Sequence, residues 1–131
     1  MEILLHDKSF QISSQIERNI KCIDDTISVK KVYDPETAIS NASAANYKIL
    51  ITDGNNLEGR FKELTHTFKG SNPDSYLIVL LCFGDIKLKD RFIDNGADSC
   101  FDRISEFDLF IDFIKSINKE FNDNLNFQNA V

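Results

Sequence analysis

Short apolar segments alternate with longer segments of mixed polarity along almost the whole chain. The apolar segments predict five strands, over residues 3–5, 26–32, 49–52, 76–82 and 99–102. The fourth segment is apolar at nearly every position, which is typical of a central parallel strand buried on both faces. The second is rich in β-branched residues, which also favours a strand. Together they predict a sheet whose strands are separated by helical segments.

The apolar residues between the first four strands recur at helical spacing. Ser9 is a predicted N-cap, because isoleucines at positions 12, 16 and 20 follow it along one helix face. Asp34-Pro35 predicts the start of a second helix, where the aspartate caps the helix and the proline fits its first turn. A loop is expected over residues 54–59, and leucines and phenylalanines at helical spacing between Leu57 and Phe68 predict a third helix. One helix is therefore expected in each of these gaps.

Two further helices are predicted in the second half of the chain. Gly84-Asp85 opens a short helix, which Asn95-Gly96 closes in the manner of a C-cap. The last helix is expected to start at Ser105, which together with Asp108 resembles a capping box. Its apolar stripe continues to Phe121. Five helices thus alternate with the five predicted strands.

This alternation predicts a doubly wound α/β domain with a five-stranded parallel sheet. The chain has 131 residues, which is enough for one such domain with its own core. We expect the domain to span residues 1–121. Residues 122–131 are rich in asparagine and lack a clear apolar period, so we expect a frayed tail or the start of a linker there.

Composition argues against several classes of protein. The formal net charge is −6 at pH 7, whereas a nucleic-acid-binding protein needs a basic face to neutralise phosphates. No apolar stretch approaches the length of a membrane span and the N-terminus does not resemble a signal peptide, so we expect a cytoplasmic protein without a membrane partner. Cys22, Cys82 and Cys100 follow neither a disulfide framework nor a zinc spacing, so we expect reduced and mostly buried thiols.

Two aspartates stand at the ends of apolar runs. Asp7 follows the first run, and Asp53 ends the third run just before Gly54. The carboxyl ends of neighbouring parallel strands lie along one edge of a sheet, where α/β proteins place their sites. We therefore predict that Asp7 and Asp53 form an acidic pocket. A simpler interpretation of Asp53 is that it only caps the turn that follows, because Asp-Gly is a common turn dipeptide.

These residues resemble the receiver domain of bacterial two-component response regulators. The likeness is carried by Leu5-His6-Asp7, by Ile49-Leu50-Ile51-Thr52-Asp53 and by Gly96-Ala97-Asp98, in that order and spacing, and it covers residues 2–118. It implies a flavodoxin-like fold with the strand order 2-1-3-4-5. It also implies that Asp53 accepts a phosphoryl group from a histidine kinase.

The resemblance further implies a Mg²⁺ ion beside the acceptor. A divalent cation is needed because a carboxylate attacks an anionic phosphate poorly unless both charges are screened. By the same likeness, Asp7 and Asp53 would bind the metal, and Asn55 would add a main-chain carbonyl oxygen. His6 stands where the family has its first acid, which removes one negative charge from the metal site.

Other positions also depart from the family pattern. Leu81 stands where the family has a hydroxyl residue, and an alignment shifted by one residue places Cys82 there instead. Neither side chain carries a hydroxyl. Arg103 replaces the family's lysine; it can still bind phosphate, but its length and planarity differ. Arg103 can also form a salt bridge with Asp53 in place of a phosphoryl contact. Cys100 stands where the family often has an aromatic switch residue.

We therefore expect an atypical receiver domain, and not an enzyme, that signals through conformation and protein contacts. Phosphotransfer is expected to be weak or absent, and Mg²⁺ binding weak. One alternative is a fully competent phospho-acceptor domain that uses Asp53 and Mg²⁺. Another is a small α/β enzyme or flavin-binding domain of similar topology, although the loop after the first strand is short and acidic, which disfavours an anionic cofactor.

The expected partner is a histidine kinase or another signalling protein. The resemblance also implies a homodimer through the fourth helix, the fifth strand and the fifth helix. Leu109 and Phe113 support this interface, because they lie four residues apart on a second apolar face of the last helix. The alternative is that both side chains pack under the asparagine-rich tail.

Overall fold

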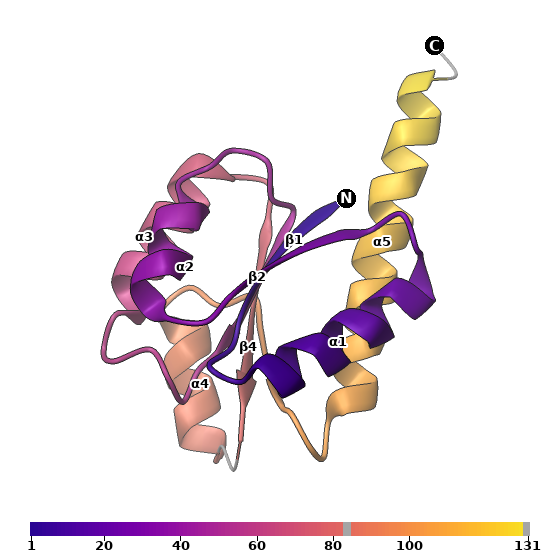
Figure 1. Ribbon diagram of the computed structural model, residues 1–131. Helices are drawn as coiled ribbons and strands as arrows, with labels where there is room; N and C mark the ends of the chain where they lie inside the picture. The colour runs from indigo at the N-terminus through magenta and orange to yellow at the C-terminus, as the bar shows by residue number, and fades with distance from the viewer. Residues whose placement is uncertain (83–84, 130–131) are drawn as a thin grey trace.

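Five parallel strands form one sheet in the order β2-β1-β3-β4-β5. The computed structural model describes residues 1–82 and 85–129 (Figure 1). The strands are β1 (Glu2–His6), β2 (Ser28–Val32), β3 (Ile49–Asp53), β4 (Tyr76–Leu81) and β5 (Ser99–Asp102). The predicted α/β class, the number of strands and the flavodoxin-like strand order are confirmed.

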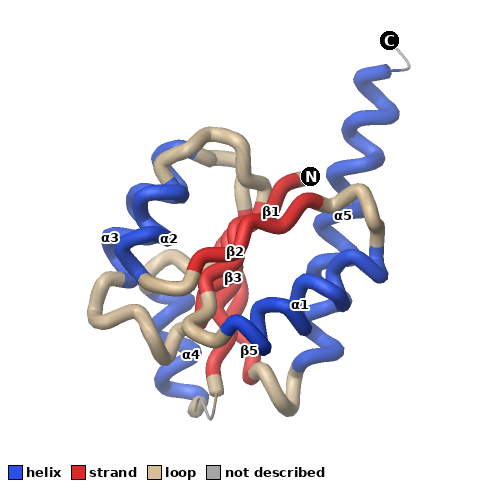
Figure 2. Tube along the Cα trace, viewed as in Figure 1, coloured by secondary structure: helices blue, strands red, loops and turns tan. Residues whose placement is uncertain are grey.

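Helices cover both faces of this sheet. On one face lie α1 (Phe10–Ile23) and α5 (Phe107–Asn129), and on the other lie α2 (Pro35–Ala42), α3 (Phe61–Ser71) and α4 (Ile86–Asp94) (Figures 1 and 2). Because all the strand pairs are parallel, the carboxyl ends of the strands lie along the same edge of the sheet. That edge is where the predicted acidic pocket belongs.

Two separate cores lie on the two faces of the sheet. Successive residues of a strand point to opposite faces, so Ile3 and Leu5 enter the core under α1 and α5, whereas Leu4 enters the core under α2, α3 and α4. The interior strand β4 is buried throughout residues 77–81. This confirms the prediction that the most apolar run is covered on both sides.

Side-chain caps begin three of the helices. Ser9 caps α1, Asp34 caps α2 and Asp85 caps α4, each through a side-chain oxygen that accepts from the N–H group three residues later, at 3.2, 2.8 and 2.7 Å. The starts predicted from these residues are confirmed, while Gly84 lies outside the described residues. Gly96 has a φ of 114° just after α4, which is the left-handed conformation expected of a glycine that closes a helix.

Helix α3 begins at Phe61, after the loop that we expected over residues 54–59, whereas α5 begins later than the sequence predicts. Leu57 has the spacing of the apolar residues of α3, and it is buried in the loop before the helix. The first hydrogen bond of α5 is accepted by the carbonyl of Glu106, so Ser105 is not the N-cap. The N–H of Ser105 instead donates to the carboxylate of Asp102, 2.9 Å away, and this contact stabilises a turn before the helix.

Helix α5 continues through residues 122–129, where we predicted a frayed tail or linker. Its last turns extend past the sheet and away from the body of the molecule (Figure 1). Asparagine is a weak helix former, and the segment has too few apolar residues to show a helical spacing. The sequence therefore does not predict this part of the helix. The boundary that we placed after residue 121 stays a prediction.

The cysteines differ from expectation, because none of the three is fully buried. Cys22 is exposed on α1, and Cys82 and Cys100 are half-buried. Burial raises the pKa of the Cys100 thiol to about 11, and the nearby Lys89 opposes this shift only in part. A thiol with so high a pKa supplies little of the reactive thiolate near neutral pH.

Alkylation should therefore distinguish Cys22 from Cys100. We expect iodoacetamide at mildly alkaline pH to modify Cys22 at least about tenfold faster, because Cys22 is exposed whereas Cys100 is half-buried and its raised pKa leaves little thiolate. Peptide mass spectrometry after a time course gives both rates. Denatured protein, in which all cysteines react, is the control, and equal rates at the two sites in the folded protein would contradict the assignment.

Candidate functional site

Asp7 and Asp53 lie side by side at the carboxyl edge of the sheet. His6 of β1 pairs with Thr52 of β3, so the residue after each of them occupies the same level of two neighbouring strands. The two aspartates are only 3% and 8% exposed. Both line a cavity of about 440 Å³, whose other lining residues are Lys8, Ser9, Ile12, Asn55, Asn56, Cys82 and Arg103. The predicted meeting of the two carboxylates at one edge is thus observed.

The two oxygens of Asp7 have different partners. Oδ1 accepts a hydrogen bond of 2.8 Å from the N–H of Ser9, at the start of α1. Oδ2 lies 4.0 Å from Nη1 of Arg103. Burial raises the pKa of Asp7, and repulsion by Asp53 acts in the same direction, while the bond from Ser9 and the charge of Arg103 oppose it. The Asp7 carboxylate is therefore a poorly solvated charge that favours a nearby cation.

Asp53 uses both carboxylate oxygens on the loop that follows β3. Oδ1 accepts from the N–H of Asn55 at 3.0 Å, and Oδ2 accepts from the side-chain amide of Asn56 at 2.5 Å. The Asn55 side chain in turn accepts from the N–H of Cys82 at 2.7 Å, which ties the loop to the end of β4. The turn-capping role that we considered for Asp53 is real, and it coexists with a place in the cavity.

Asn56 is a site residue that sequence reasoning missed. It lines the cavity and donates directly to Asp53. The available signal was a side-chain amide three residues after an aspartate in an Asp-Gly turn, where Asx side chains commonly bond to nearby polar groups. That signal predicts a local bond but does not say which oxygen of the acid it occupies.

His6 lies beside the acid pair but does not line the cavity. Its side chain is buried, with Nδ1 2.8 Å from the hydroxyl oxygen of Thr52. Nε2 has no hydrogen-bond partner among the described residues. Burial lowers the pKa of His6, although attraction to Asp53 and Asp34 opposes the shift. A neutral imidazole therefore fills the place where the resemblance implies a first acid.

Leu81 and Cys82 point to different places. Leu81 is completely buried in the core under α2, α3 and α4, and a Cβ atom placed on Gly54 would come within 2.7 Å of its Cδ2 atom. Cys82 lines the cavity with the two acids. Of the two residues considered for the hydroxyl position, only Cys82 borders the cavity.

Arg103 completes the cavity at the end of β5. Its backbone N–H donates to the carbonyl of Leu81 at 2.7 Å, which continues the pairing of β5 with β4 beyond the last strand residue. Its guanidinium group, half-buried, faces Asp7. No ion pair within 4.0 Å joins it to Asp53 in the described part of the chain, so the salt bridge that we expected forms with the neighbouring acid.

The donor set fits a small divalent cation. The carboxylates of Asp7 and Asp53, with the main-chain carbonyl of Asn55, are oxygen ligands of the kind that Mg²⁺ prefers, and Mg²⁺ usually keeps several of its waters. Within residues 1–82 and 85–129, no three His, Cys, Asp or Glu side chains gather as a metal cluster. A metal here would rest on two carboxylates, one carbonyl and water.

Comparison with known proteins supports the fold. No protein-family model and no curated protein matches the sequence. Among solved structures, the signal receiver domain of a DNA-binding response regulator from Colwellia psychrerythraea 34H matches with a TM-score of 0.77 and 15% identity, over 91% of this chain and 98% of that one. A two-component response regulator from Clostridium difficile matches with a TM-score of 0.77 and 14% identity, over 93% and 98%.

The chain has the fold of a response regulator receiver domain. A response regulator from Burkholderia pseudomallei, solved with a phosphorylated aspartic acid, a calcium ion and citrate, also shares this receiver fold. It matches with a TM-score of 0.70 and 16% identity, over 98% of this chain and 74% of that one. No helix in the described part of the chain is both long and apolar enough to cross a bilayer.

Proposed function

We propose that this chain is an atypical receiver domain of a two-component phosphorelay, which signals through conformation and protein contacts. The observation that carries the proposal is the acid pair, because Asp7 and Asp53 line one cavity at the carboxyl edge of a receiver-type sheet. The proposed partner is a histidine kinase or another signalling protein, and the proposed compartment is the cytoplasm.

Three side chains support weak or absent phosphotransfer to Asp53. Leu81 offers an apolar group and lies in the core, away from the cavity. Cys82 borders the cavity with a thiol, which is a weak hydrogen-bond donor. Arg103 directs its charge toward Asp7, so part of the negative charge that would attract Mg²⁺ is already compensated.

A fully competent phospho-acceptor is the second candidate. Both carboxylates are in place beside an open cavity, and Arg103 is long enough and cationic enough to contact phosphate oxygens. A flavin-binding role is less favoured, because buried carboxylates repel the phosphate of such a cofactor.

The resemblance implies a homodimer through α4, β5 and α5, and the structure gives it mixed support. Leu109 is 54% exposed on α5 and is available to a partner. Phe113 instead packs its ring against Tyr76 and Phe101, with ring centroids 5.9 and 6.0 Å apart. An interface on this face would therefore depend on Leu109 and its exposed neighbours.

Two measurements test the proposed function. We expect a Mg²⁺ titration in the millimolar range to shift the amide resonances around Asp7 and Asp53, and we expect acetyl phosphate to produce little phosphoryl adduct by intact mass. Asp53→Asn is the control for both. Rapid, complete phosphorylation of the unmodified chain would favour the competent alternative, and no amide shifts at the two acids would contradict the metal site.

A further inference from the structure

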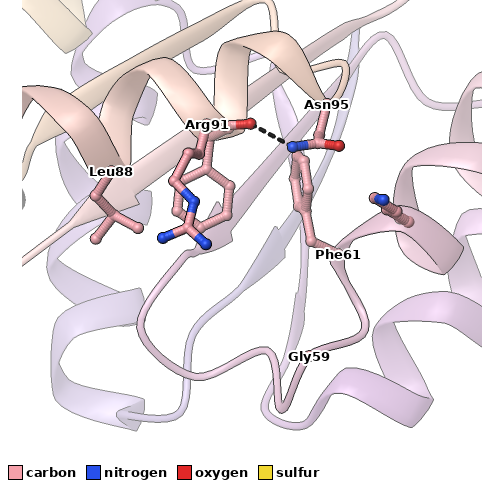
Figure 3. A pocket seen from close by; sticks show the side chains of 7 residues that line it. Gly59, Phe61, Leu88, Arg91 and Asn95 are labelled. Carbon is pink, nitrogen blue, oxygen red and sulfur yellow. Dashed lines mark hydrogen bonds between the residues drawn. The ribbon is translucent and has the colours of Figure 1, made fainter.

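An apolar groove lies between α3 and α4, away from the acid pair. It has a volume of about 470 Å³ and is lined by Gly59, Phe61, Lys62, Leu88, Arg91, Phe92 and Asn95 (Figure 3). The rings of Phe61 and Phe92 meet edge to face, with centroids 4.8 Å apart, and Leu88 lies beside them. Such a surface can accept one large apolar side chain.

The groove exists because α4 is only partly covered. Leu88 and Phe92 pack against the core under α2, α3 and α4, but no residue of α4 is fully buried. The other helices that the structure describes each contribute buried apolar side chains, such as Ile16 of α1 and Phe110 of α5. A further apolar group in the groove would bury more of Leu88 and Phe92.

Two cations stand at this groove. Lys62 on α3 and Arg91 on α4 both line it, and both are exposed. Within residues 1–82 and 85–129, neither forms an ion pair with a carboxylate. In a chain whose net charge is −6, two unpaired cations beside an aromatic surface favour an occupant that carries an acid next to an apolar side chain.

The projecting end of α5 carries this combination of side chains. Asp123 and Phe127 are four residues apart and thus share one face of the helix. Both are exposed, and the Phe127 side chain is 74% exposed. This end extends beyond the body of the molecule, where it can reach another copy of the chain (Figure 1).

We propose that the end of α5 from one copy docks in the α3–α4 groove of a second copy. Phe127 enters between Leu88 and Phe92, and Asp123 lies near Lys62 and Arg91. Groove and helix end are different surfaces, so the contact is heterologous and each copy keeps one free groove and one free helix end. Because the contact covers only about two helical turns, association is weak and becomes visible at high micromolar concentrations.

Sedimentation velocity across a concentration series tests this contact in the full chain. We expect the unmodified chain to form assemblies larger than dimers as its concentration rises, whereas Lys62→Glu/Arg91→Glu and Phe127→Ser each stay monomeric. Matched controls that associate normally are Lys30→Glu/Lys87→Glu, which reverses two exposed lysines outside the groove, and Leu125→Ser, on another face of the same helix end. A thermal melt of every variant checks that it is folded.

Mixing the two monomeric variants gives the sharpest result. The groove variant still has an intact helix end, and the Phe127→Ser variant still has an intact groove. Their equimolar mixture should therefore form dimers that cannot grow further. A monomeric mixture would overturn the proposal, as would an unmodified chain that stays monomeric. Self-association that neither variant changes would also overturn it and would favour a symmetric dimer through α4, β5 and α5.

Discussion

Alanine at Gly54 will destabilise the domain by about 1–3 kcal/mol, the usual range for overpacking a well-packed site. The new Cβ atom would lie 2.7 Å from Cδ2 of Leu81 and 2.7 Å from Cγ1 of Val79, and 3.1 Å from Cζ of Phe92. Two of these neighbours belong to the buried strand β4, so they cannot move away without disturbing the core. Chemical denaturation at equilibrium measures the loss.

Gly70→Ala is the matched control for this substitution. Gly70 lies in α3, and a Cβ atom placed there would meet nothing within 4 Å. Alanine has the higher helix propensity, so this variant should equal or exceed the original stability, by up to about 1 kcal/mol. If both variants lost stability equally, the cause would be a general effect of removing glycine and not the contact with Leu81.

A double-mutant cycle with Leu81 isolates the close contact. Leu81→Ala alone removes a fully buried side chain and should cost about 2–5 kcal/mol. The same change removes one of the two 2.7 Å contacts of a Cβ atom on Gly54, while the contact with Val79 remains. The double variant should then be more stable than the sum of the single losses predicts, by about 1 kcal/mol. Strict additivity would mean that Gly54 and Leu81 do not constrain one another.

The fold could be predicted because its dominant signals are local and repeat five times. Residues 76–82 are apolar at every position, so side chains on both faces of the strand are apolar. This is typical of a strand that is covered on both faces. The caps Ser9 and Asp34 combine a side-chain oxygen with a following helical period, and both act as predicted. The packing of the apolar residues of β1 and β3 sets the register of these two parallel strands. This register places Asp7 and Asp53 next to each other at the carboxyl edge of the sheet.

The contacts that the sequence did not predict depend on the conformations of long or polar side chains and on their hydrogen-bond partners. Whether Arg103 faces Asp7 or Asp53 depends on a rotamer, and sequence spacing does not determine it. Asn56 reaches an oxygen of Asp53 only because the loop after Gly54 folds back. Ser105 has the spacing of a capping residue, but its N–H donates to the carboxylate of Asp102 in a turn that precedes α5. Each of these outcomes is a competition between nearby polar groups.

The second large expected effect is on the affinity of the acid pair for Mg²⁺, because side chains compete with the metal for oxygens of Asp7 and Asp53. In both aspartates, Oδ1 accepts a hydrogen bond from a backbone N–H. The donor is Ser9 for Asp7 and Asn55 for Asp53. Oδ2 of Asp53 instead meets the Asn56 amide, and Oδ2 of Asp7 faces Arg103. These two oxygens are held only by side chains, so a cation would reach them by displacing Asn56 and Arg103.

Asn56→Ala should therefore bind Mg²⁺ roughly tenfold more tightly than the unmodified chain. A hydrogen bond to a charged group is worth about 1.5–3 kcal/mol, and in the unmodified chain metal binding must give up this bond at Oδ2 of Asp53. Arg103→Met should add to the gain, because it removes a positive charge from Asp7 while keeping an apolar stem in place. Titration calorimetry, or amide shifts where binding is weak, measures both affinities.

Two controls separate this competition from a general change in the protein. Asn19→Ala removes an asparagine that bonds to a carbonyl on the surface of α1, and it should leave Mg²⁺ affinity unchanged. Asp53→Asn, combined with Asn56→Ala, removes a ligand and should abolish the gain. If Asn56→Ala binds Mg²⁺ no more tightly than the unmodified chain, the Asn56 amide does not compete with the metal for Asp53. The weakness of the site would then have to come from Arg103 and from the acid missing at His6, and Arg103→Met would recover only the part that is due to Arg103.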